Sequence, residues 1–460
     1  MNLTVQAGNS SYSFDSLREL MGKAGDFRSG DKLAGVAAGN AAERIAAKRV
    51  LSELTVHEIT ENPAVPYEED AVTRMIMDDL DRDAYHAIEN LTIAQLREWL
   101  LDDRTSGEMM LAAGRGMTSE VIAAVSKLMD NMDLMYGGSK MHIEATCNTT
   151  IGGENVLASR LQPNHPVDDP RGVAASVLEG LSYGAGDAVL GLNPAIDSVE
   201  DTLAVWDQLA QIRDTLHVPT QTCVLSHITT QMKALQTGGK ADLCFQSIAG
   251  TQKALGSFGV TADMLEEARE MFLQDGSAKG PNVMYFETGQ GSELSSGFHY
   301  GWDQQTMECR CYGLARHYHP FLVNTVVGFM GPEYLYDSHQ LLRAGLEDVF
   351  CGHLHGLPMG CDACYTNHMP TDQNDIENLA VLLTSAGCHY FMGLPQGDDV
   401  MLMYQSTGYH DIAALRMMLK KRPVPEFEKW LEEYGILENG HFGPHAGDPT
   451  VFAKRMKSRG

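Results

Sequence analysis

The sequence has little positive charge and no long apolar run. Its 460 residues include 34 lysines and arginines against 61 aspartates and glutamates, a formal net charge of −27. Such a surface repels the phosphates of nucleic acids and the head groups of anionic membranes, so we expect neither as a partner. No stretch approaches the roughly 18 consecutive apolar residues of a membrane-spanning helix. No basic segment followed by an apolar one opens the chain, as it would in a secretory signal, and we expect a cytoplasmic protein.

The cysteines do not form a pattern typical of disulfide-rich proteins. Nine cysteines are spread widely along the chain, whereas small secreted proteins carry a dense and even-numbered set. We therefore expect reduced thiols. The glycine motifs G-x-G-x-x-G and G-x-x-x-x-G-K-[ST] are also absent, as are internal repeats and low-complexity linkers. The absence of the two glycine motifs excludes the commonest dinucleotide and nucleotide sites.

The first 150 residues have mainly helical patterns. Residues 16–19 (SLRE) and 92–95 (TIAQ) have the form of capping boxes. Residues 41–54 repeat apolar side chains at steps of three and four, which is typical of an amphipathic helix. Pro63 interrupts the pattern, because a residue before proline is biased out of the helical region. We predict an N-terminal helical region over residues 1–150 whose role is packing.

From about residue 150, short β-rich apolar runs appear, each followed by a helical stretch. Eight runs can be counted. Alternating strands and helices form parallel sheets, and eight such units favour an α/β fold of the (β/α)₈ (TIM) barrel type, with the active site at the carboxyl ends of the strands. An open doubly wound sheet is the alternative. The runs are 157–162, 188–193, 222–227, 243–247, 283–287, 322–329, 357–362 and 388–393.

The chain after the eighth run contains one more helical segment. Residues 426–434 (EFEKWLEEY) are periodic, and Pro423 and Pro425 just before them are a plausible start signal. We therefore predict a catalytic barrel over residues 151–424 and a short C-terminal extension over residues 425–460.

Polar side chains stand at or near the ends of the runs. They are Arg160, Gln162, Asn193, His227, Gln246, Ser247, Glu287, Asn324 and Asp362, with Met392 at the last run. Carboxylates bind an ammonium group by charge-assisted hydrogen bonds, and a guanidinium with carboxamides can orient a hydroxyl group. The set favours a small, polar, cationic substrate, although each residue alone could equally cap a helix or bind backbone.

Two other patterns suggest different chemistry. Cys361 and Cys364 form a lone C-x-x-C, and His353 with His355 and Asp362 could serve a zinc-dependent barrel hydrolase. Zinc needs three or four ligands, however, and the two histidines precede the seventh run, at the amino end of that strand. The 25 methionines, with Met401 and Met403 just after the last run, indicate adaptable core packing or a broad surface for a large planar cofactor.

Six collinear stretches resemble the large subunit of ethanolamine ammonia-lyase. They are FRSGDKLAGVAA (27–38), ASRLQPNHP (158–166), EGLSYGAGDAVLGLNP (179–194), MYFETGQGSELS (284–295), YGLARHYHPFLVNTVVGFMGPEYLY (312–336) and GCDACYTNH (360–368). The likeness runs from about residue 2 to about residue 452. It implies a (β/α)₈ barrel that uses adenosylcobalamin in a radical reaction converting 2-aminoethanol to acetaldehyde and ammonia.

The resemblance also implies roles for individual residues. Glu287, Asp362 and Arg160 would be catalytic; Gln162, Glu287 and Asp362 would hold the amino group, and Arg160 and Asn193 the hydroxyl. The cofactor would contact Pro194, Gln246, Ser295 and Met401, and the cavity walls would include Phe329 and Met392. No metal-ligating residue is expected. The sequence lacks D-x-H-x-x-G, since residues 337–342 (DSHQLL) miss its glycine; this fits a family in which the cofactor's own benzimidazole ligates cobalt.

The same resemblance implies partners. A separate small subunit would close over the cofactor, and six large and six small chains would form a hetero-dodecamer. Members of the family are often associated with a bacterial microcompartment. A different adenosylcobalamin-dependent amino-alcohol lyase and a non-catalytic subunit of an assembly remain as alternatives, and the preference between 2-aminoethanol and 2-aminopropanol stays open.

Overall fold

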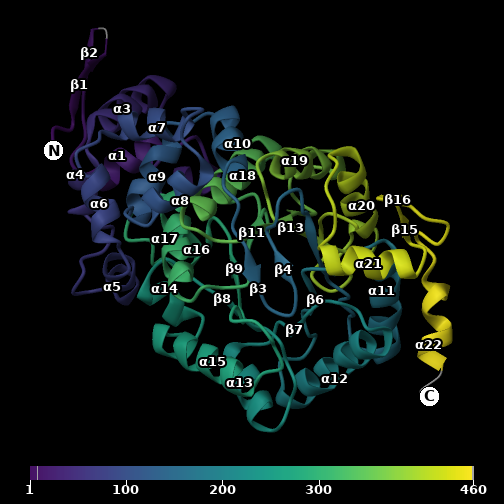
Figure 1. The fold of residues 1–460 in the computed structure, drawn as a ribbon. Helices are drawn as coiled ribbons and strands as arrows, with labels where there is room; N and C mark the ends of the chain where they lie inside the picture. Colours follow the sequence, from purple (N-terminus) through teal and green to yellow (C-terminus); the bar gives the residue numbers. More distant parts are fainter. Residues whose placement is uncertain (8, 458–460) are drawn as a thin grey trace.

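Eight parallel strands form a barrel at the centre of the molecule (Figure 1). The computed structural model describes residues 1–7 and 9–457. The strand order is β7-β6-β5-β13-β11-β10-β9-β8, so the first barrel strand, β5, pairs with the last, β13. The two end strands also meet, because the Leu243 amide donates a hydrogen bond of 3.3 Å to the Thr222 carbonyl. The predicted barrel is confirmed, and the open sheet is wrong.

Each of the eight predicted runs coincides with one barrel strand to within a few residues. The strands are β5 Ala158–Leu161, β6 Val189–Leu192, β7 Thr222–Val224, β8 Cys244–Ser247, β9 Met284–Thr288, β10 Leu322–Val327, β11 Met359–Ala363 and β13 Tyr390–Gly393. Six lie wholly inside their runs, and β9 and β11 end one residue later. The strands are almost entirely buried, which explains why each is a nearly continuous apolar run instead of an alternating one.

Helices connect successive strands and surround the barrel (Figure 1). Most begin with a polar side chain that accepts a hydrogen bond from the first turn, as Asp337 does from the Gln340 amide at the start of α18. The helices are α11 Pro170–Ser182, α12 Val199–Leu216, α13 Ile228–Gln236, α14 Gln252–Ser257, α15 Ala262–Asp275, α16 Ser292–Ser296, α17 Gln304–His317, α18 Ser338–Leu354, α19 Gln373–Ser385 and α20 Tyr409–Met418.

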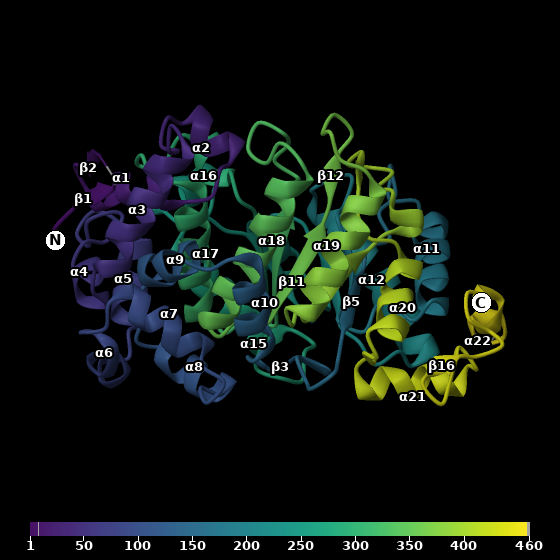
Figure 2. The same ribbon diagram turned by 90° about the horizontal axis from the view of Figure 1, so that it is seen from above.

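The loop after β13 is distinctive because it carries structure of its own. It contains the 3-10 helix η1 Pro395–Gly397 and the short strand β14 Tyr404–Gln405, which pairs with β12 Tyr365–Thr366 in the loop after β11. Figure 2 shows β12 among the loops at the top of the barrel, beyond the carboxyl end of β11. This small two-stranded sheet therefore lies on the side of the barrel where the active site is expected.

The N-terminal region is helical as predicted, and it packs beside the barrel (Figure 2). A capping box opens α7 at Thr92 and Gln95, whereas at α1 Ser16 caps the helix and the Glu19 side chain accepts from the Asp15 amide instead. The helices are α1 Leu17–Ala24, α2 Ser29–Leu33, α3 Ala41–Glu53, α4 Val56–Thr60, α5 Ala71–Asp78, α6 Arg82–Ile88, α7 Ile93–Leu101, α8 Gly107–Gly114, α9 Ser119–Lys127 and α10 Asn131–Ser139.

Two short hairpins in this region were not predicted. They pair β1 Thr4–Ala7 with β2 Ser10–Ser13, and β3 Ala145–Thr146 with β4 Thr150–Ile151. β1 and β2 are largely polar and solvent-exposed, and β3 and β4 have two residues each. Neither pair carries the apolar signal by which buried strands are recognised.

Buried ion pairs join the N-terminal helices to the barrel. Arg310 of α17 is fully buried; it donates to Glu120 at 2.6 Å and Asp70 at 2.9 Å. Lys127 of α9 pairs with Asp303 at 2.6 Å. One hydrophobic core also continues from the N-terminal helices through the barrel to the C-terminal segment. The N-terminal region, the barrel and the C-terminal extension therefore pack into one structure. The proposed boundaries between them, near residues 150 and 424, stay predictions.

Arg310→Ala is expected to destabilise the chain by about 3–5 kcal/mol, because it leaves two buried carboxylates without their cation. Denaturant unfolding of the purified chain measures this loss. Arg171→Ala is the matched control, since its side chain is 93% exposed and pairs with Asp169 at the surface; it should change the free energy of unfolding by less than about 1 kcal/mol. Equal effects of the two substitutions would contradict the structural role of Arg310.

The C-terminal segment begins with the predicted helix, α21 Pro425–Glu433. Beyond it lie β15 Leu437–Glu438, β16 His441–Phe442, the 3-10 helix η2 Pro449–Phe452 and α22 Ala453–Lys457. Trp430 of α21 stacks on Phe452 with ring centroids 5.6 Å apart, which fixes this segment against the helix. None of the described helices is long and apolar enough to cross a membrane.

Candidate active site

The carboxyl ends of the barrel strands enclose a cavity of about 320 Å³. Its wall is formed by side chains at the strand ends and in the loops that follow them. All five predicted substrate residues and both predicted wall residues line it. They are Arg160, Gln162, Asn193, Glu287, Asp362, Phe329 and Met392. Residues that are far apart in the sequence thus meet at one place, because parallel strands end on the same side of a barrel.

Arg160, on β5, lies at the centre of the polar contacts. Its Nη1 donates to Glu287 Oε1 and to the Tyr285 hydroxyl, each at 2.6 Å. Its Nη2 donates to Gln162 Oε1 and, at 3.5 Å, to Asn193 Oδ1. Burial alone would lower the pKa of the guanidinium, but the facing tyrosine and carboxylate raise it above its ordinary value. Arg160 is therefore a fixed positive charge that orients four neighbours.

Glu287, on β9, is the more accessible of the two carboxylates, with 17% of its side chain exposed. Its Oε1 accepts three hydrogen bonds, from Arg160, from Tyr285 at 2.9 Å and from Asn324 at 3.3 Å. All of these contacts are to one oxygen. The carboxylate is therefore held in place while its Oε2 stays available to a ligand in the cavity.

Asp362, on β11, is almost fully buried. It accepts a hydrogen bond from the Ser406 hydroxyl, which comes from the loop after β13. Burial raises the pKa of this carboxyl group to about 7, against the opposing effects of Ser406 and Arg160. Asp362 therefore changes its charge near neutral pH, and a cation bound beside it would favour the ionised form.

The other strand-end residues either belong to the cavity, cap a helix or bind backbone. Ser247 lines the cavity and Asn324 binds Glu287. His227 caps α13, because its Nδ1 accepts from the Thr229 amide, and this is a structural role. The Gln246 amide bonds to backbone at Ile228 and Ser247.

The site also includes residues that the sequence did not suggest: Tyr404 lines the cavity, and Tyr285 and Asp399 contact side chains that line it. Tyr285 lies two positions before Glu287 on β9, and since alternate residues of a strand face the same side, this spacing could have revealed it. Tyr404 places its hydroxyl 3.3 Å from Gln162 Nε2 and packs its ring edge-on against Phe329. Asp399 accepts from Gln162 Nε2 at 2.8 Å. Tyr404 and Asp399 come from a loop remote in sequence, and no local pattern marks them.

The four predicted cofactor residues lie near the barrel mouth but do not line the 320 Å³ cavity. Pro194 follows β6 by two residues, and Gln246 is buried on β8. Ser295 is exposed on α16, where its hydroxyl donates to the Ser292 carbonyl at 2.8 Å. Met401 is half-buried in the loop after β13. Their roles stay predictions.

Apolar side chains remain exposed around this mouth. Phe329 after β10 is 43% exposed, and Val400 and Met403 after β13 are 56% and 71% exposed. An exposed apolar rim of this kind usually marks a site that a ligand or partner covers. Such a rim suits a broad ligand with apolar faces, whereas the cavity beneath it, where polar groups meet apolar side chains such as Val326 and Met392, has room for a small molecule.

The histidines of the zinc hypothesis are not brought to the cavity. His353 lies at the end of α18, with Nδ1 near the Gly138 carbonyl and Nε2 near His389. His355 contacts Ser119 and the Cys351 carbonyl, and burial lowers the pKa of His355 to about 3. Within residues 1–7 and 9–457, no group of three or more histidine, cysteine or acidic side chains is arranged to hold a metal ion.

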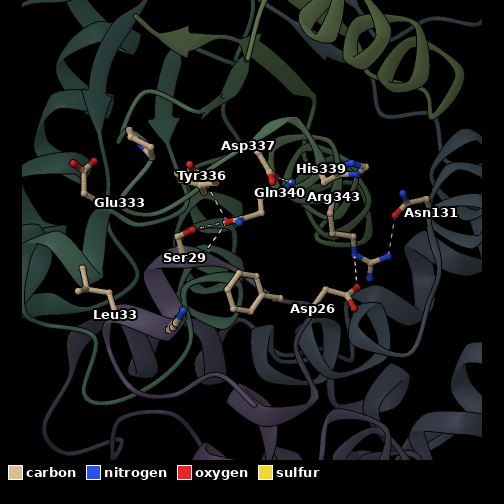
Figure 3. A pocket seen from close by; sticks show the side chains of 13 residues that line it. Asp26, Ser29, Leu33, Asn131, Glu333, Tyr336, Asp337, His339, Gln340 and Arg343 are labelled. Atoms are coloured by element: carbon tan, nitrogen blue, oxygen red, sulfur yellow. Dashed lines mark hydrogen bonds and ion pairs between the residues drawn. The ribbon is translucent and has the colours of Figure 1, made fainter. Parts of the chain in front are cut away.

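A larger and more open cavity of about 1030 Å³ lies between α2 and the start of α18 (Figure 3). Its polar groups largely bind one another. Gln340 Oε1 accepts from the Ser29 amide at 2.9 Å, and Arg343 pairs with Asp26 at 2.9 Å and Asn131 at 3.1 Å. None of the strand-end residues lines it. It is therefore the weaker candidate for a catalytic site.

Fold and cavity together define a class. A (β/α)₈ barrel whose strand ends converge on two carboxylates, one guanidinium and several carboxamides is a barrel enzyme for a small polar substrate.

Comparison with known proteins identifies the family within that class. The family model of the ethanolamine ammonia lyase large subunit (EutB) matches residues 12–445. The chain is 53% identical to the ethanolamine ammonia-lyase large subunit of Salmonella typhimurium over 452 residues, which cover 98% of this chain and all of the relative. It is 52% identical, with the same coverage, to the subunit of that name from Escherichia coli strain K12. The chain belongs to the ethanolamine ammonia-lyase large-subunit family.

Proposed function

We propose that this chain converts 2-aminoethanol to acetaldehyde and ammonia, as the catalytic subunit of an adenosylcobalamin-dependent lyase. The observation that carries the proposal is the meeting of Arg160, Glu287 and Asp362 in one cavity of about 320 Å³. The volume suits a small substrate. The charges suit a molecule with a cationic end and a neutral hydroxyl end.

The proposed binding mode follows from these charges. The ammonium group lies against Glu287 and Asp362, and Gln162 Oε1 accepts a further hydrogen bond from it. The hydroxyl group lies against Arg160 and Asn193, whose donors also stabilise negative charge that develops on the oxygen when the nitrogen moves. The two ends of the substrate are thereby distinguished, and the reacting carbons are held between them.

The apolar rim supports adenosylcobalamin as the cofactor. Pro194, Gln246, Ser295 and Met401 are the residues proposed to hold it, with Phe329 and Met392 on the wall beneath. The bound cofactor would supply the radical that removes and returns a hydrogen atom, chemistry for which amino-acid side chains alone are unsuited. The chain's own part would be to position the substrate and to exclude water. Phe329 and Leu402, apolar side chains that line the cavity, would limit the entry of water.

A small subunit is the proposed cover of the mouth. The matched relatives are named large subunits, and exposed side chains such as Val400 and Met403 are of the kind that a partner or ligand buries. Assembly as six large and six small chains, and residence within a bacterial microcompartment, are further proposals that rest on the resemblance of the sequence.

Asp362 gives the proposed reaction a characteristic pH dependence. Because burial raises the pKa of Asp362 to about 7, the carboxyl group of the free enzyme is neutral below this pH and ionised above it. Only the ionised form attracts the ammonium group, so kcat/KM is expected to rise with pH through about 7 and then level off. This rise is the acidic limb of the pH profile. In the profile of kcat the acidic limb should lie at lower pH, because the bound ammonium group favours the ionised form of Asp362.

Steady-state kinetics at a series of pH values tests this expectation. Asp362→Asn should abolish the limb in the residual kcat/KM, while Asp372→Asn, a substitution in an exposed helix cap of the adjacent loop, should leave it in place. A limb that persists unchanged in Asp362→Asn would assign the titration to another group.

The function itself is tested by product analysis. This chain is co-expressed with a small subunit, loaded with adenosylcobalamin and given 2-aminoethanol; equal amounts of acetaldehyde and ammonia are expected. If the complex releases product from 2-aminopropanol but not from 2-aminoethanol, the substrate is 2-aminopropanol and the proposed substrate is wrong. An assembled, cofactor-loaded complex that releases no product from either would contradict the proposal.

A further inference from the structure

The loop after β13 contains a buried carboxylate that the proposed reaction does not use. Asp399 is 2% exposed. Its contacts among the described residues are four amide N–H groups, two from backbone and two from side chains, and no cation. Burying a carboxylate is costly unless hydrogen bonds satisfy its oxygens. The four hydrogen bonds together offset this cost.

One oxygen of Asp399 organises the loop itself. Its Oδ1 accepts from the backbone amides of Met401 at 2.9 Å and Leu402 at 2.6 Å. Leu402 lines the cavity, and Met401 is a predicted cofactor contact. The Asp399 amide also donates to the Tyr404 carbonyl at 3.0 Å, which closes the turn. The carboxylate therefore sets where this part of the mouth lies.

The other oxygen organises two strand ends. Asp399 Oδ2 accepts from Gln162 Nε2 at 2.8 Å and from Asn164 Nδ2 at 2.9 Å. Asn164 in turn accepts, through Oδ1, from the backbone amide of Asn193 at 2.9 Å. The ends of β5 and β6 are thus tied to the same carboxylate as the loop after β13.

The contact with Gln162 decides which end of its side-chain amide faces the cavity. A carboxamide has a donor end and an acceptor end of nearly the same shape. Because Asp399 can only accept, it holds Nε2 on its own side, and Oε1 is left facing Arg160. In the flipped orientation the amide nitrogen would face both the guanidinium and the ammonium group of the substrate, and these groups would repel one another.

We propose that Asp399 is a positioning residue: it fixes the Gln162 side chain with its oxygen toward Arg160 and the substrate, and it couples this orientation to the loop that carries Leu402. The inference rests on the proposed function for its substrate and goes beyond it in assigning a role to a residue that does not touch the reacting atoms.

Asp399→Asn tests the proposal in the assembled, cofactor-loaded enzyme. The carboxamide keeps the size of the side chain but cannot accept four hydrogen bonds. We expect a fall of about 100-fold in kcat/KM for 2-aminoethanol, mainly through KM, because a small misplacement of contacting groups has effects of this size. The matched control is Asp398→Asn, since Asp398 is exposed and contacts Gln405 at 3.0 Å; it should stay within about 2-fold of the wild type.

A double-mutant cycle separates positioning from general structural damage. If Asp399 acts through Gln162, then Asp399→Asn should lower kcat/KM much less in a Gln162→Ala background, by about 10-fold or less, than in the wild type. Fully additive losses would overturn the proposal. If Asp399→Asn does not assemble, Asn164→Ala removes one of the four contacts to Asp399, together with the bond from the Asn193 amide, and keeps the other three contacts to Asp399. A KM equal to that of the wild type would then overturn the proposal.

A crystal structure of the Asp399→Asn enzyme keeps the test independent of the proposed substrate. The expected result is a rotated Gln162 amide and a displaced segment around Leu402, whichever substrate the wild type accepts. An unchanged Gln162 and loop would contradict the inference. Wild-type enzyme that leaves 2-aminoethanol unreacted would instead contradict the proposed function, and the structure would still decide the role of Asp399.

Discussion

Glu287→Gln is expected to leave the chain folded and to lower kcat/KM for 2-aminoethanol by about 1,000-fold, equivalent to about 4 kcal/mol. The substitution keeps the shape of the side chain and its contacts with Tyr285 and Asn324. It removes the charge that the ammonium group would meet, and it leaves the buried guanidinium of Arg160 without its nearest carboxylate. Glu287→Gln thus weakens two charge-assisted contacts, one with the substrate ammonium group and one with Arg160, and these two losses account for the size of the effect.

The control for this prediction is Glu333→Gln, because Glu333 lines the larger cavity beside α2 (Figure 3) and not the barrel mouth. It should change kcat/KM by less than about 2-fold. Measurements of both variants at saturating adenosylcobalamin, together with thermal unfolding, separate chemistry from folding. A Glu287→Gln enzyme with near-normal kcat/KM would show that the ammonium group is anchored elsewhere.

Arg160→Ala is expected to have the second large effect, a loss of about 1,000-fold or more in kcat/KM. The guanidinium contacts Glu287, Tyr285, Gln162 and Asn193, so its removal frees four side chains at once. Arg160→Lys should recover only part of the activity, since an ammonium group cannot make the same fork of contacts.

Added guanidinium provides a sharper test of Arg160. Millimolar guanidinium can refill the space left in Arg160→Ala, and it should restore about 10-fold or more of the lost kcat/KM by returning a positive charge to Glu287. Urea, which has a similar shape and no charge, is the control and should restore little. Equal rescue by both compounds, or an Arg160→Ala enzyme of near-wild-type activity, would contradict the role of positioned charge.

The barrel could be predicted because its signal is strong and repeated. Strands such as β6 and β13 are buried along their whole length, so each leaves an uninterrupted apolar run in the sequence. The strand pairs β1–β2 and β12–β14 were missed for the opposite reason. They are short and partly exposed, and their pairing depends on where the surrounding loops lie.

The candidate site divides in the same way. Residues at strand ends, such as Glu287 and Asp362, were predicted because the ends of parallel strands must converge. Asp399 and Ser406 could not be predicted, because each contacts a residue that is distant in the sequence. Asp399, for example, accepts a hydrogen bond from Gln162, which is 237 positions away. The raised pKa of Asp362 was equally hidden, because it arises mainly from burial in the folded barrel.

A structure of the assembled, cofactor-loaded enzyme with 2-aminoethanol bound tests the central claim most directly. The account predicts the substrate nitrogen about 2.7–3.1 Å from carboxylate oxygens of Glu287 and Asp362, with its hydroxyl group toward Arg160 and Asn193. Substrate bound in the reverse orientation, or in the larger cavity beside Asp26 and Arg343, would contradict it.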